Sequence, residues 1–159
     1  MSSKPEKSYA LAFVCTGNIC RSPMAAIVVR EHLRRAGLAD LVEVTSAGTG
    51  PWHVGDAADS RAQKTLADHG YPTDHIAAQV GVEHLDADLL LAMDAGHARD
   101  LRRMASADKI RLLRSFDPAA GDDLDVPDPY YGGDDGFLVV LTMIEAATPG
   151  LVDWVRENL

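Results

Sequence analysis

The segment YALAFVCTGNICRSPMAAIVVREHLRRAG, residues 9–37, predicts a buried strand, a tight turn and an amphipathic helix. Tyr9–Val14 is a nearly continuous apolar run ending at Cys15, a pattern typical of parallel strands, which are covered on both faces. Pro23 fits the first position of the helix that follows, because its missing N–H needs no partner there. Apolar side chains then recur at helical spacing, and Gly37 favours the end of the helix.

The rest of the chain repeats this alternation. Further strands are expected at 42–46, 89–93 and 110–113. Helices are expected over Ala58–His69 with Gly70 and Pro72 at its end, from Asp94 through Ala98, Leu101 and Met104, and from Phe137 onward, where Pro149 should break or kink the helix. Between the last strand and the last helix, 115–136 is a long loop rich in aspartate, proline and glycine, and such loops are commonly functional or mobile.

The alternation predicts a single α/β domain over residues 1–159, with a four-stranded parallel sheet and helices on both faces. We expect residues 1–8 to be flexible. In such folds the ligand binds beyond the carboxyl ends of the strands. Cys15 lies at that end of the first strand, and the 115–136 loop follows the fourth, so both are expected at the site.

Composition excludes several other classes of protein. At 159 residues, with 47% hydrophobic and 25% charged residues, the chain fits one globular domain and is neither collagen-like nor disordered. No apolar run approaches the roughly 20 residues of a membrane span, and no signal peptide is visible. Fifteen Lys and Arg against 24 Asp and Glu give a net charge of −9, which argues against nucleic acid as a partner.

Residues 15–23, Cys-Thr-Gly-Asn-Ile-Cys-Arg-Ser-Pro, combine a nucleophile with an anion site. A turn between strand and helix can aim successive backbone N–H groups at one centre, a nest for a tetrahedral anion. The start of the helix adds positive potential, and Gly17 permits backbone angles that other residues resist. Arg21 offers a planar fork of donors for two phosphate oxygens. The same positive field favours the thiolate form of Cys15.

Other interpretations of this segment explain less. A lone C-x5-R spacing arises easily by chance, and a buried cysteine is most often a small apolar residue. The preceding strand, Ser22-Pro23 and the helical stripe favour the functional interpretation. A Walker loop fails because no Gly-Lys-Ser/Thr follows. A zinc site fails because two cysteines five apart, without paired histidines, do not make a tetrahedral set. The sequence therefore predicts no metal and no cofactor.

The segment Val14–Pro23, VCTGNICRSP, resembles the phosphate loop of low-molecular-weight protein tyrosine phosphatases. Asp128–Gly132, DPYYG, resembles their general-acid loop. The resemblance runs from about Tyr9 to the C-terminus and is closest to actinobacterial members, through the stretches 46–55 and 70–80. It implies a flavodoxin-like fold of the phosphotyrosine phosphatase I type, with residues 1–159 as one phosphatase domain. It also implies a cytoplasmic signalling hydrolase that acts on phosphotyrosine in proteins.

The resemblance assigns the chemistry to three residues. Cys15 is the expected nucleophile, Arg21 the phosphoryl-binding group, and Asp128 the acid that protonates the leaving group and then activates water. By composition alone Asp128 is one of many acids in its loop, although Pro127 and Pro129 make its turn rigid. The residues expected to bind substrate are Thr16, Gly17, Asn18, Ile19, Cys20 and Ser22 in the phosphate loop, and Trp52, His53, Tyr130 and Tyr131 in the cleft walls.

The same resemblance implies a supporting network. Asn18 and Ser22 are expected to hold the loop in shape together with Ser46 and His75, and the Ser22 hydroxyl to stabilise the thiolate as it leaves. Cys20 has two open interpretations: a buried residue at the helix entry, or a redox guard that forms a disulfide with oxidised Cys15.

The expected cleft is aromatic, which suits a phenyl phosphate because packed rings gain energy beyond buried area. Trp52 could also be a packed loop residue, and His53 an exposed polar one. The other histidines, His32, His69, His84 and His97, show no partner pattern in the sequence.

Three rival functions fit this sequence less well. Arsenate reduction needs further cysteines outside the loop, and this chain has none. Arginine phosphatases resemble this loop but carry threonine where this chain has Ile19, and an apolar Ile19 with paired tyrosines favours a phenyl ring. An inactive phosphate-binding module would lack the cysteine, arginine or acid. The sequence leaves open whether a tyrosine kinase acts on Tyr130 or Tyr131, and whether the protein is exported without a cleaved signal.

Overall fold

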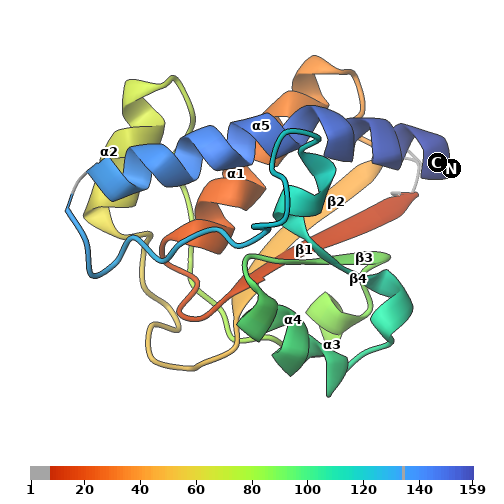
Figure 1. Cartoon of the computed structure of the whole chain (residues 1–159), viewed down its shortest axis with the longest axis horizontal. Helices are drawn as coiled ribbons and strands as arrows, with labels where there is room; N and C mark the ends of the chain where they lie inside the picture. The colour runs from red at the N-terminus through yellow and green to blue at the C-terminus, as the bar shows by residue number, and fades with distance from the viewer. Residues whose placement is uncertain (1–7, 134) are drawn as a thin grey trace, which may run out of the picture.

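The computed structural model describes residues 8–133 and 135–159, which form a four-stranded parallel sheet flanked by helices (Figure 1). The strands are β1 (Tyr9–Cys15), β2 (Val42–Gly48), β3 (Leu89–Ala92) and β4 (Ile110–Leu112), in the spatial order β2-β1-β3-β4. This order is flavodoxin-like. The point at which the strand order across the sheet reverses lies between β1 and β3. The predicted fold class is confirmed.

Two layers of helices cover the sheet, as Figure 1 shows. The α-helices are α1 (Arg21–Arg35), α2 (Ser60–Asp68), α3 (Val82–Leu85), α4 (Ala95–Arg102) and α5 (Asp135–Asn158), and short 3-10 turns span Ala107–Lys109 (η1) and Leu113–Phe116 (η2). The helices α1 and α5 pack on one face of the sheet with α2 beside them, and α3 and α4 lie on the other face.

Strand β1 is the centre of the core. Leu11 and Phe13 face the α1 and α5 layer, whereas Ala12 and Val14 face the α4 layer, and all four are fully buried. Burial on both faces explains why this strand is an almost unbroken apolar run. It also holds the Cys15 end of the strand rigidly, next to the start of α1.

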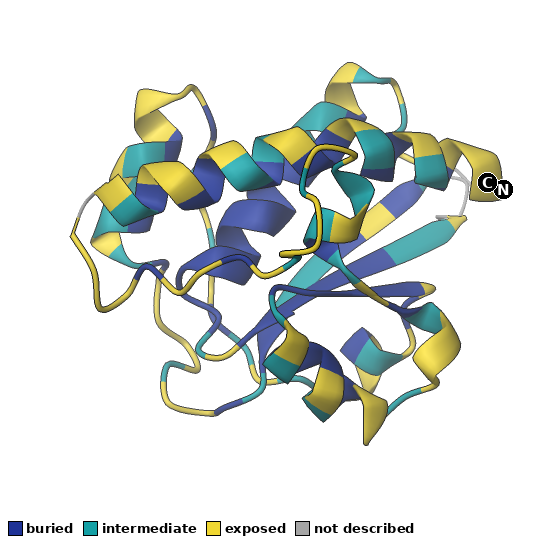
Figure 2. Ribbon diagram, viewed as in Figure 1, coloured by how far each residue is buried: buried dark blue, intermediate teal, exposed yellow. Residues whose placement is uncertain are grey.

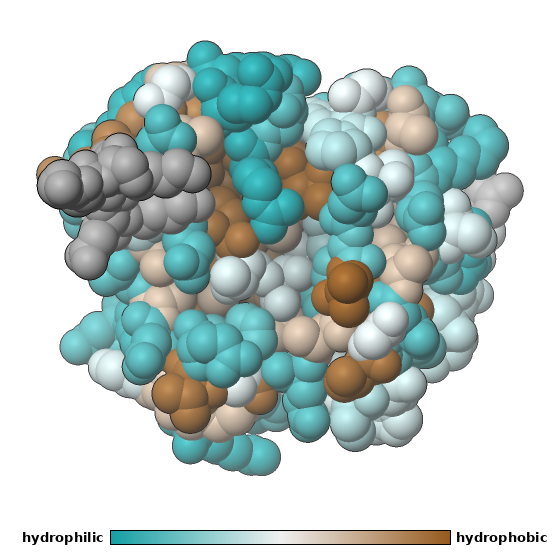
Figure 3. Space-filling model, turned by 180° about the vertical axis from the view of Figure 1, so that it is seen from behind, coloured by the Kyte–Doolittle hydropathy of each residue, from teal (hydrophilic) through white to brown (hydrophobic). Residues whose placement is uncertain are grey.

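Helix α5 is long and apolar enough to cross a membrane by length and composition alone. In the fold, however, its apolar face is buried against α1 and the sheet, and its outer face is exposed (Figure 2). That pattern is typical of a core helix in a globular domain. The face of the molecule in Figure 3 is mostly hydrophilic, with apolar residues in small separate groups, as is usual for exposed apolar side chains.

Two local predictions were wrong, and the break or kink expected at Pro149 is not a break. Helix α1 begins at Arg21, so Pro23 is its third residue and not its first. Met104 lies beyond the end of α4 and is 45% exposed, so it does not extend the buried stripe. Pro149 does not break the last helix, because α5 continues through it to Asn158. Pro149 has no N–H to donate to the carbonyl four residues earlier in the helix. Because Pro149 is on the exposed side of α5, water can solvate that carbonyl instead.

The flexible segment expected at 1–8 lies outside the described residues except for Ser8. The Ser8 backbone N–H donates to the Leu41 carbonyl at 2.8 Å, which ties this residue to the start of β2.

Candidate active site

The loop between β1 and α1 is held by backbone bonds to the chain that follows β2. The Thr49 N–H donates to the Cys15 carbonyl at 2.9 Å, and the Gly50 N–H to the Thr16 carbonyl at 3.0 Å. A Cβ on Gly48 would lie 2.5 Å from the Thr16 oxygen, so only glycine allows this approach. The loop is therefore shaped by its neighbours as well as by its own sequence.

Asn18 is the internal anchor of the loop. It has a positive φ of 57° and is fully buried. Its Nδ2 donates to Ser22 Oγ at 2.8 Å and to Ser46 Oγ at 3.0 Å, and its Oδ1 accepts from the Ala78 N–H at 2.9 Å. His75 Nε2 donates to the Asn18 carbonyl at 2.6 Å, and burial lowers the pKa of this imidazole. All four expected network residues thus lie together behind the loop.

Cys15 lies at the floor of this arrangement and is 2% exposed. Its Sγ is 2.9 Å from Ser22 Oγ. Because the Asn18 amide already donates to that hydroxyl oxygen, the Ser22 proton is free to point at the sulfur. This geometry places a hydroxyl group beside the sulfur at the floor of the loop.

Arg21 is oriented by buried acceptors. Its Nη1 donates to Asp94 Oδ2 at 2.9 Å and to the Val126 carbonyl at 3.0 Å, and its Nη2 lies 3.7 Å from Asp128 Oδ2. Burial acts to raise the pKa of Asp94, but the His97 N–H and the charges of His97 and Arg21 outweigh it, so this pKa lies below its usual value. Asp94 therefore stays ionised beside the guanidinium.

His97 is a neighbour of the loop that sequence reasoning missed. Its Nε2 is 2.8 Å from Thr16 Oγ1, and its Nδ1 lies 3.1 Å from Asp94 Oδ1 without hydrogen-bond alignment. Burial lowers the pKa of His97. Because 81 residues separate His97 from Thr16, no local pattern links the two. A local signal for His97 was its position three residues after Asp94, which caps α4.

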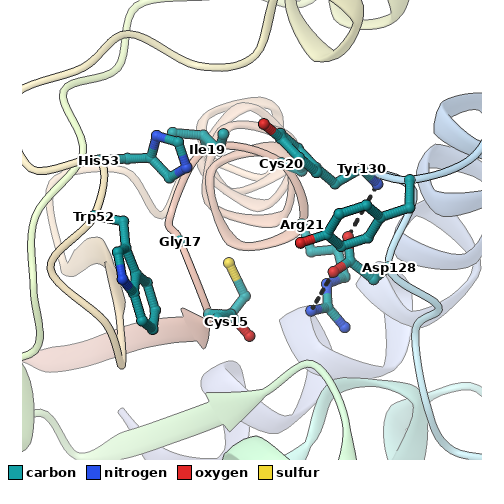
Figure 4. A pocket seen from close by; sticks show the side chains of 11 residues that line it. Cys15, Gly17, Ile19, Cys20, Arg21, Trp52, His53, Asp128 and Tyr130 are labelled. Carbon is teal, nitrogen blue, oxygen red and sulfur yellow. Dashed lines mark hydrogen bonds and ion pairs between the residues drawn. The ribbon is translucent and has the colours of Figure 1, made fainter.

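A pocket of about 360 Å³ opens above Cys15 (Figure 4). Its lining consists of Cys15, Thr16, Gly17, Ile19, Cys20, Arg21, Trp52, His53, Asp128, Tyr130 and Tyr131. Trp52 and His53 form one side, and Tyr130 and Asp128 form the other. Of the residues expected to bind substrate, Asn18 and Ser22 do not line the pocket, because their side chains are fully buried behind the loop.

The two walls are held differently. Trp52 is 71% exposed but sits on Gly50, where a Cβ would lie 1.7 Å from the indole ring. Tyr130 packs edge-on against Tyr131 with ring centroids 5.0 Å apart. The tryptophan wall thus depends on a glycine beneath it.

Asp128 extends into the pocket from a loop tied to the sheet. The Val126 N–H donates to the Met93 carbonyl at 2.7 Å, just after β3. The Tyr130 N–H donates to Asp128 Oδ1 at 3.0 Å, which leaves Oδ2 facing Arg21. One carboxylate oxygen is therefore oriented by the backbone and the other faces the pocket.

Cys20 is buried and differs from Cys15 in its surroundings. Desolvation, with a contribution from Asp59, raises the pKa of its thiol to about 12. Cys20 therefore stays protonated near neutral pH. Both cysteines are free thiols. Within residues 8–133 and 135–159, no group of three or more His, Cys, Asp or Glu side chains is arranged to hold a metal.

Comparisons with known proteins agree with this geometry. The family model for low molecular weight phosphotyrosine protein phosphatase matches residues 10–159. A low molecular weight protein-tyrosine phosphatase A of Mycobacterium bovis is 60% identical over 94% of this chain and 93% of its own length. A low molecular weight protein-tyrosine-phosphatase of Streptomyces coelicolor is 58% identical over 96% of each chain. The crystal structure of an Entamoeba histolytica protein tyrosine phosphatase superposes with a TM-score of 0.90 and 35% identity, over 95% of this chain and 99% of that one.

Proposed function

The chain belongs to the low molecular weight phosphotyrosine protein phosphatase family, and we propose that it hydrolyses phosphotyrosine in proteins through a phosphocysteine at Cys15. The observation that carries this proposal is a single pocket that Cys15, Arg21 and Asp128 line together. The Ser22 hydroxyl lies 2.9 Å from the nucleophilic sulfur. The sequence-based identification of the family, with its actinobacterial members, is confirmed.

In the first step the Cys15 thiolate attacks phosphorus. A sulfur–phosphorus bond forms while the bond from phosphorus to the tyrosine oxygen breaks, and the leaving oxygen takes a proton from the Asp128 carboxyl group. Arg21 and the N–H groups of the loop bind the three remaining phosphoryl oxygens, where charge is largest during transfer. The 3.7 Å between Arg21 Nη2 and Asp128 Oδ2 supports placing the acid beside the phosphoryl group.

In the second step water attacks the phosphorus of the phosphocysteine. Asp128, now a carboxylate, accepts a proton from that water, and the sulfur–phosphorus bond breaks with its electron pair returning to sulfur. The Ser22 O–H then donates to the restored thiolate. Inorganic phosphate leaves, and the enzyme needs no metal or cofactor in this scheme.

The walls of the pocket support an aromatic substrate. Trp52 and Tyr130 stand on opposite sides of Cys15, and Ile19 adds an apolar side chain to the rim. A phenyl ring can pack between two aromatic walls, with a gain of about 0.5–1.5 kcal/mol beyond buried area. A guanidinium would leave its donors against an apolar surface at Ile19, which disfavours phosphoarginine.

The test is phosphate release from three peptides of one sequence that carry phosphotyrosine, phosphoserine or phosphoarginine, with a chelator present. Release from phosphotyrosine that Cys15→Ser abolishes is expected, and Asp128→Asn should lower kcat/KM by about 10²-fold or more. Preferred hydrolysis of phosphoarginine would contradict the argument from Ile19 and keep the cysteine chemistry. No hydrolysis by the reduced protein would contradict the proposal as a whole.

The proposal extends to the surroundings of the enzyme. We place it in the cytoplasm as a signalling phosphatase, with residues 1–159 acting as one phosphatase domain on phosphoproteins. Tyr131 is 88% exposed, so a tyrosine kinase could reach it. Phosphorylation there would put negative charge at the mouth of a pocket that binds an anion, and would weaken substrate binding.

A further inference from the structure

A chain of contacts joins the phosphate loop to the acid loop through the first turn of α2. The Asp59 N–H donates to the Ile19 carbonyl at 2.8 Å, and the Asp59 carboxylate caps α2 by accepting from the Arg61 N–H at 2.8 Å. The same carboxylate accepts from Arg61 Nε at 3.1 Å and from Nη2 at 3.0 Å. The Arg61 side chain is thus fixed by a residue that is itself bonded to the phosphate loop.

The far end of the Arg61 guanidinium holds the acid loop. Its Nη2 donates to the Tyr130 carbonyl at 3.0 Å, and its Nη1 donates to the Gly132 carbonyl at 3.3 Å. The guanidinium carbon lies 4.7 Å from the ring centroid of buried Phe137 and 5.6 Å from that of Tyr130. A planar cation between aromatic faces and a carboxylate has few other positions to adopt.

These contacts act on Asp128 through Tyr130. The Tyr130 N–H orients Asp128 Oδ1, and Arg61 holds the carbonyl of the same residue. The loop is also tied at Val126 before the acid and at Phe137 after it, and the Arg61 bonds lie between these two anchors. Moving Tyr130 would therefore move the acid relative to Cys15.

We propose that Arg61 is a positioning residue, which holds the Tyr130 and Gly132 carbonyls so that Asp128 can protonate the leaving group. This inference rests on the proposed role of Asp128. A fork-shaped side chain is required, because one group must reach Asp59 and two carbonyls at once. Lysine at this position keeps the positive charge but lacks the planar fork that reaches all three partners. Glutamine has no charge, and only one amide group to donate.

The experiment measures kcat/KM for two substrates that differ in their need for an acid. The p-nitrophenolate ion leaves easily without a proton, whereas the phenol of phenyl phosphate has a pKa near that of tyrosine, about 10, and needs one. Arg61→Gln should lower kcat/KM for phenyl phosphate about tenfold or more and for p-nitrophenyl phosphate less than about threefold, as part of the 10²–10⁴-fold that general acid catalysis contributes. Arg61→Lys should show the same selectivity with a smaller loss.

The matched control is Arg156→Gln, near the end of α5, where the arginine pairs only weakly with Asp153 at 3.4 Å. It should leave both substrates unchanged. Equal losses for the two substrates in the Arg61 variants, or no loss, would overturn the inference. If the parent enzyme hydrolyses neither substrate, the proposed function itself fails and this inference with it, whereas an active parent with parallel losses overturns the inference alone.

A second readout does not depend on turnover. Hydrogen exchange of the backbone amides over 128–133 should be faster in Arg61→Lys than in the parent and in Arg156→Gln, at a temperature where all three are folded. Unchanged exchange in this segment would overturn the inference even if Arg61→Gln proved too unstable to assay.

Discussion

Replacing Asn18 by alanine tests how much this residue of the phosphate loop contributes to the free energy of unfolding. The substitution removes three side-chain hydrogen bonds, from Nδ2 to Ser22 and Ser46 and from the Ala78 N–H to Oδ1. At about 1 kcal/mol each, their loss should cost about 3 kcal/mol. An alanine held at the φ of 57° adds about 1 kcal/mol, because its Cβ crowds the backbone in the left-handed region.

The expected total is about 4 kcal/mol of unfolding free energy, which for a chain of this size lowers the melting temperature by about 8–16 °C. Thermal and urea unfolding of the purified variant measure this directly. Asn18→Gly is the matched control, since it loses the same side-chain hydrogen bonds but glycine adopts a positive φ freely. Its free energy of unfolding should be about 1 kcal/mol higher than that of Asn18→Ala.

Two results would refute this reasoning. If Asn18→Ala unfolds within about 1 kcal/mol of the parent, the buried bonds do not stabilise the fold as their geometry indicates. If Asn18→Gly is as unstable as Asn18→Ala, the backbone conformation is not a cost to alanine.

Three further predictions concern the pocket wall, the pH dependence of stability and the second thiol. Gly50→Ala should displace the Trp52 indole, since the new Cβ would lie 1.7 Å from the ring. The loss of this one aromatic contact should raise KM for aryl phosphates about two- to tenfold. In a Trp52→Ala background, Gly50→Ala should raise KM no further. Burial lowers the pKa of His75 and His97 in the folded chain, so the unfolded chain binds more protons below the usual histidine value of about 6.5, and the free energy of unfolding should fall as the pH falls through that value and below. Urea unfolding on both sides of that pH measures this, and a slope that His97→Gln does not reduce would count against the role of that histidine. Cys20 should resist iodoacetamide near neutral pH in the folded protein, because its pKa is about 12 and almost none of it is thiolate, so mass spectrometry should find Cys20 unmodified.

The four strands and the longer helices could be predicted because their signals are local, whereas the four-residue helix α3 was not predicted. The apolar run before Cys15 predicts a strand buried on both faces, and the periodic pattern after it predicts a helix buried on one face. Both patterns can be recognised within a short stretch of the chain. The ends of elements were less well predicted. Helix α1 starts two residues before Pro23, because its first turn also closes the phosphate loop.

The residues that surround the pocket divide in the same way. Cys15 and Arg21 could be proposed from their spacing together with the predicted strand before them and helix after them, since that strand–turn–helix unit brings them to one centre. Asp128 needed the resemblance, because several acids in its loop are equivalent by composition. His97 and Arg61 were not identified, since their partners are 81 and 69 residues away in the chain.

By itself, the sequence determined the order along the chain of the four strands and the longer helices, the parallel sheet and the motif that combines nucleophile and anion site. These follow from hydrophobic periodicity and from backbone geometry within one strand–turn–helix unit. Beyond Ser46 and His75, which the family resemblance implied, only the tertiary structure decided which side chains hold that motif in place: Asp94 and His97 beneath it, and Asp59 with Arg61 between it and the acid loop. The physical reason is that hydrogen bonds and ion pairs between distant segments depend on positions to a few tenths of an ångström, which the packing of the sheet and helices sets and no local pattern records.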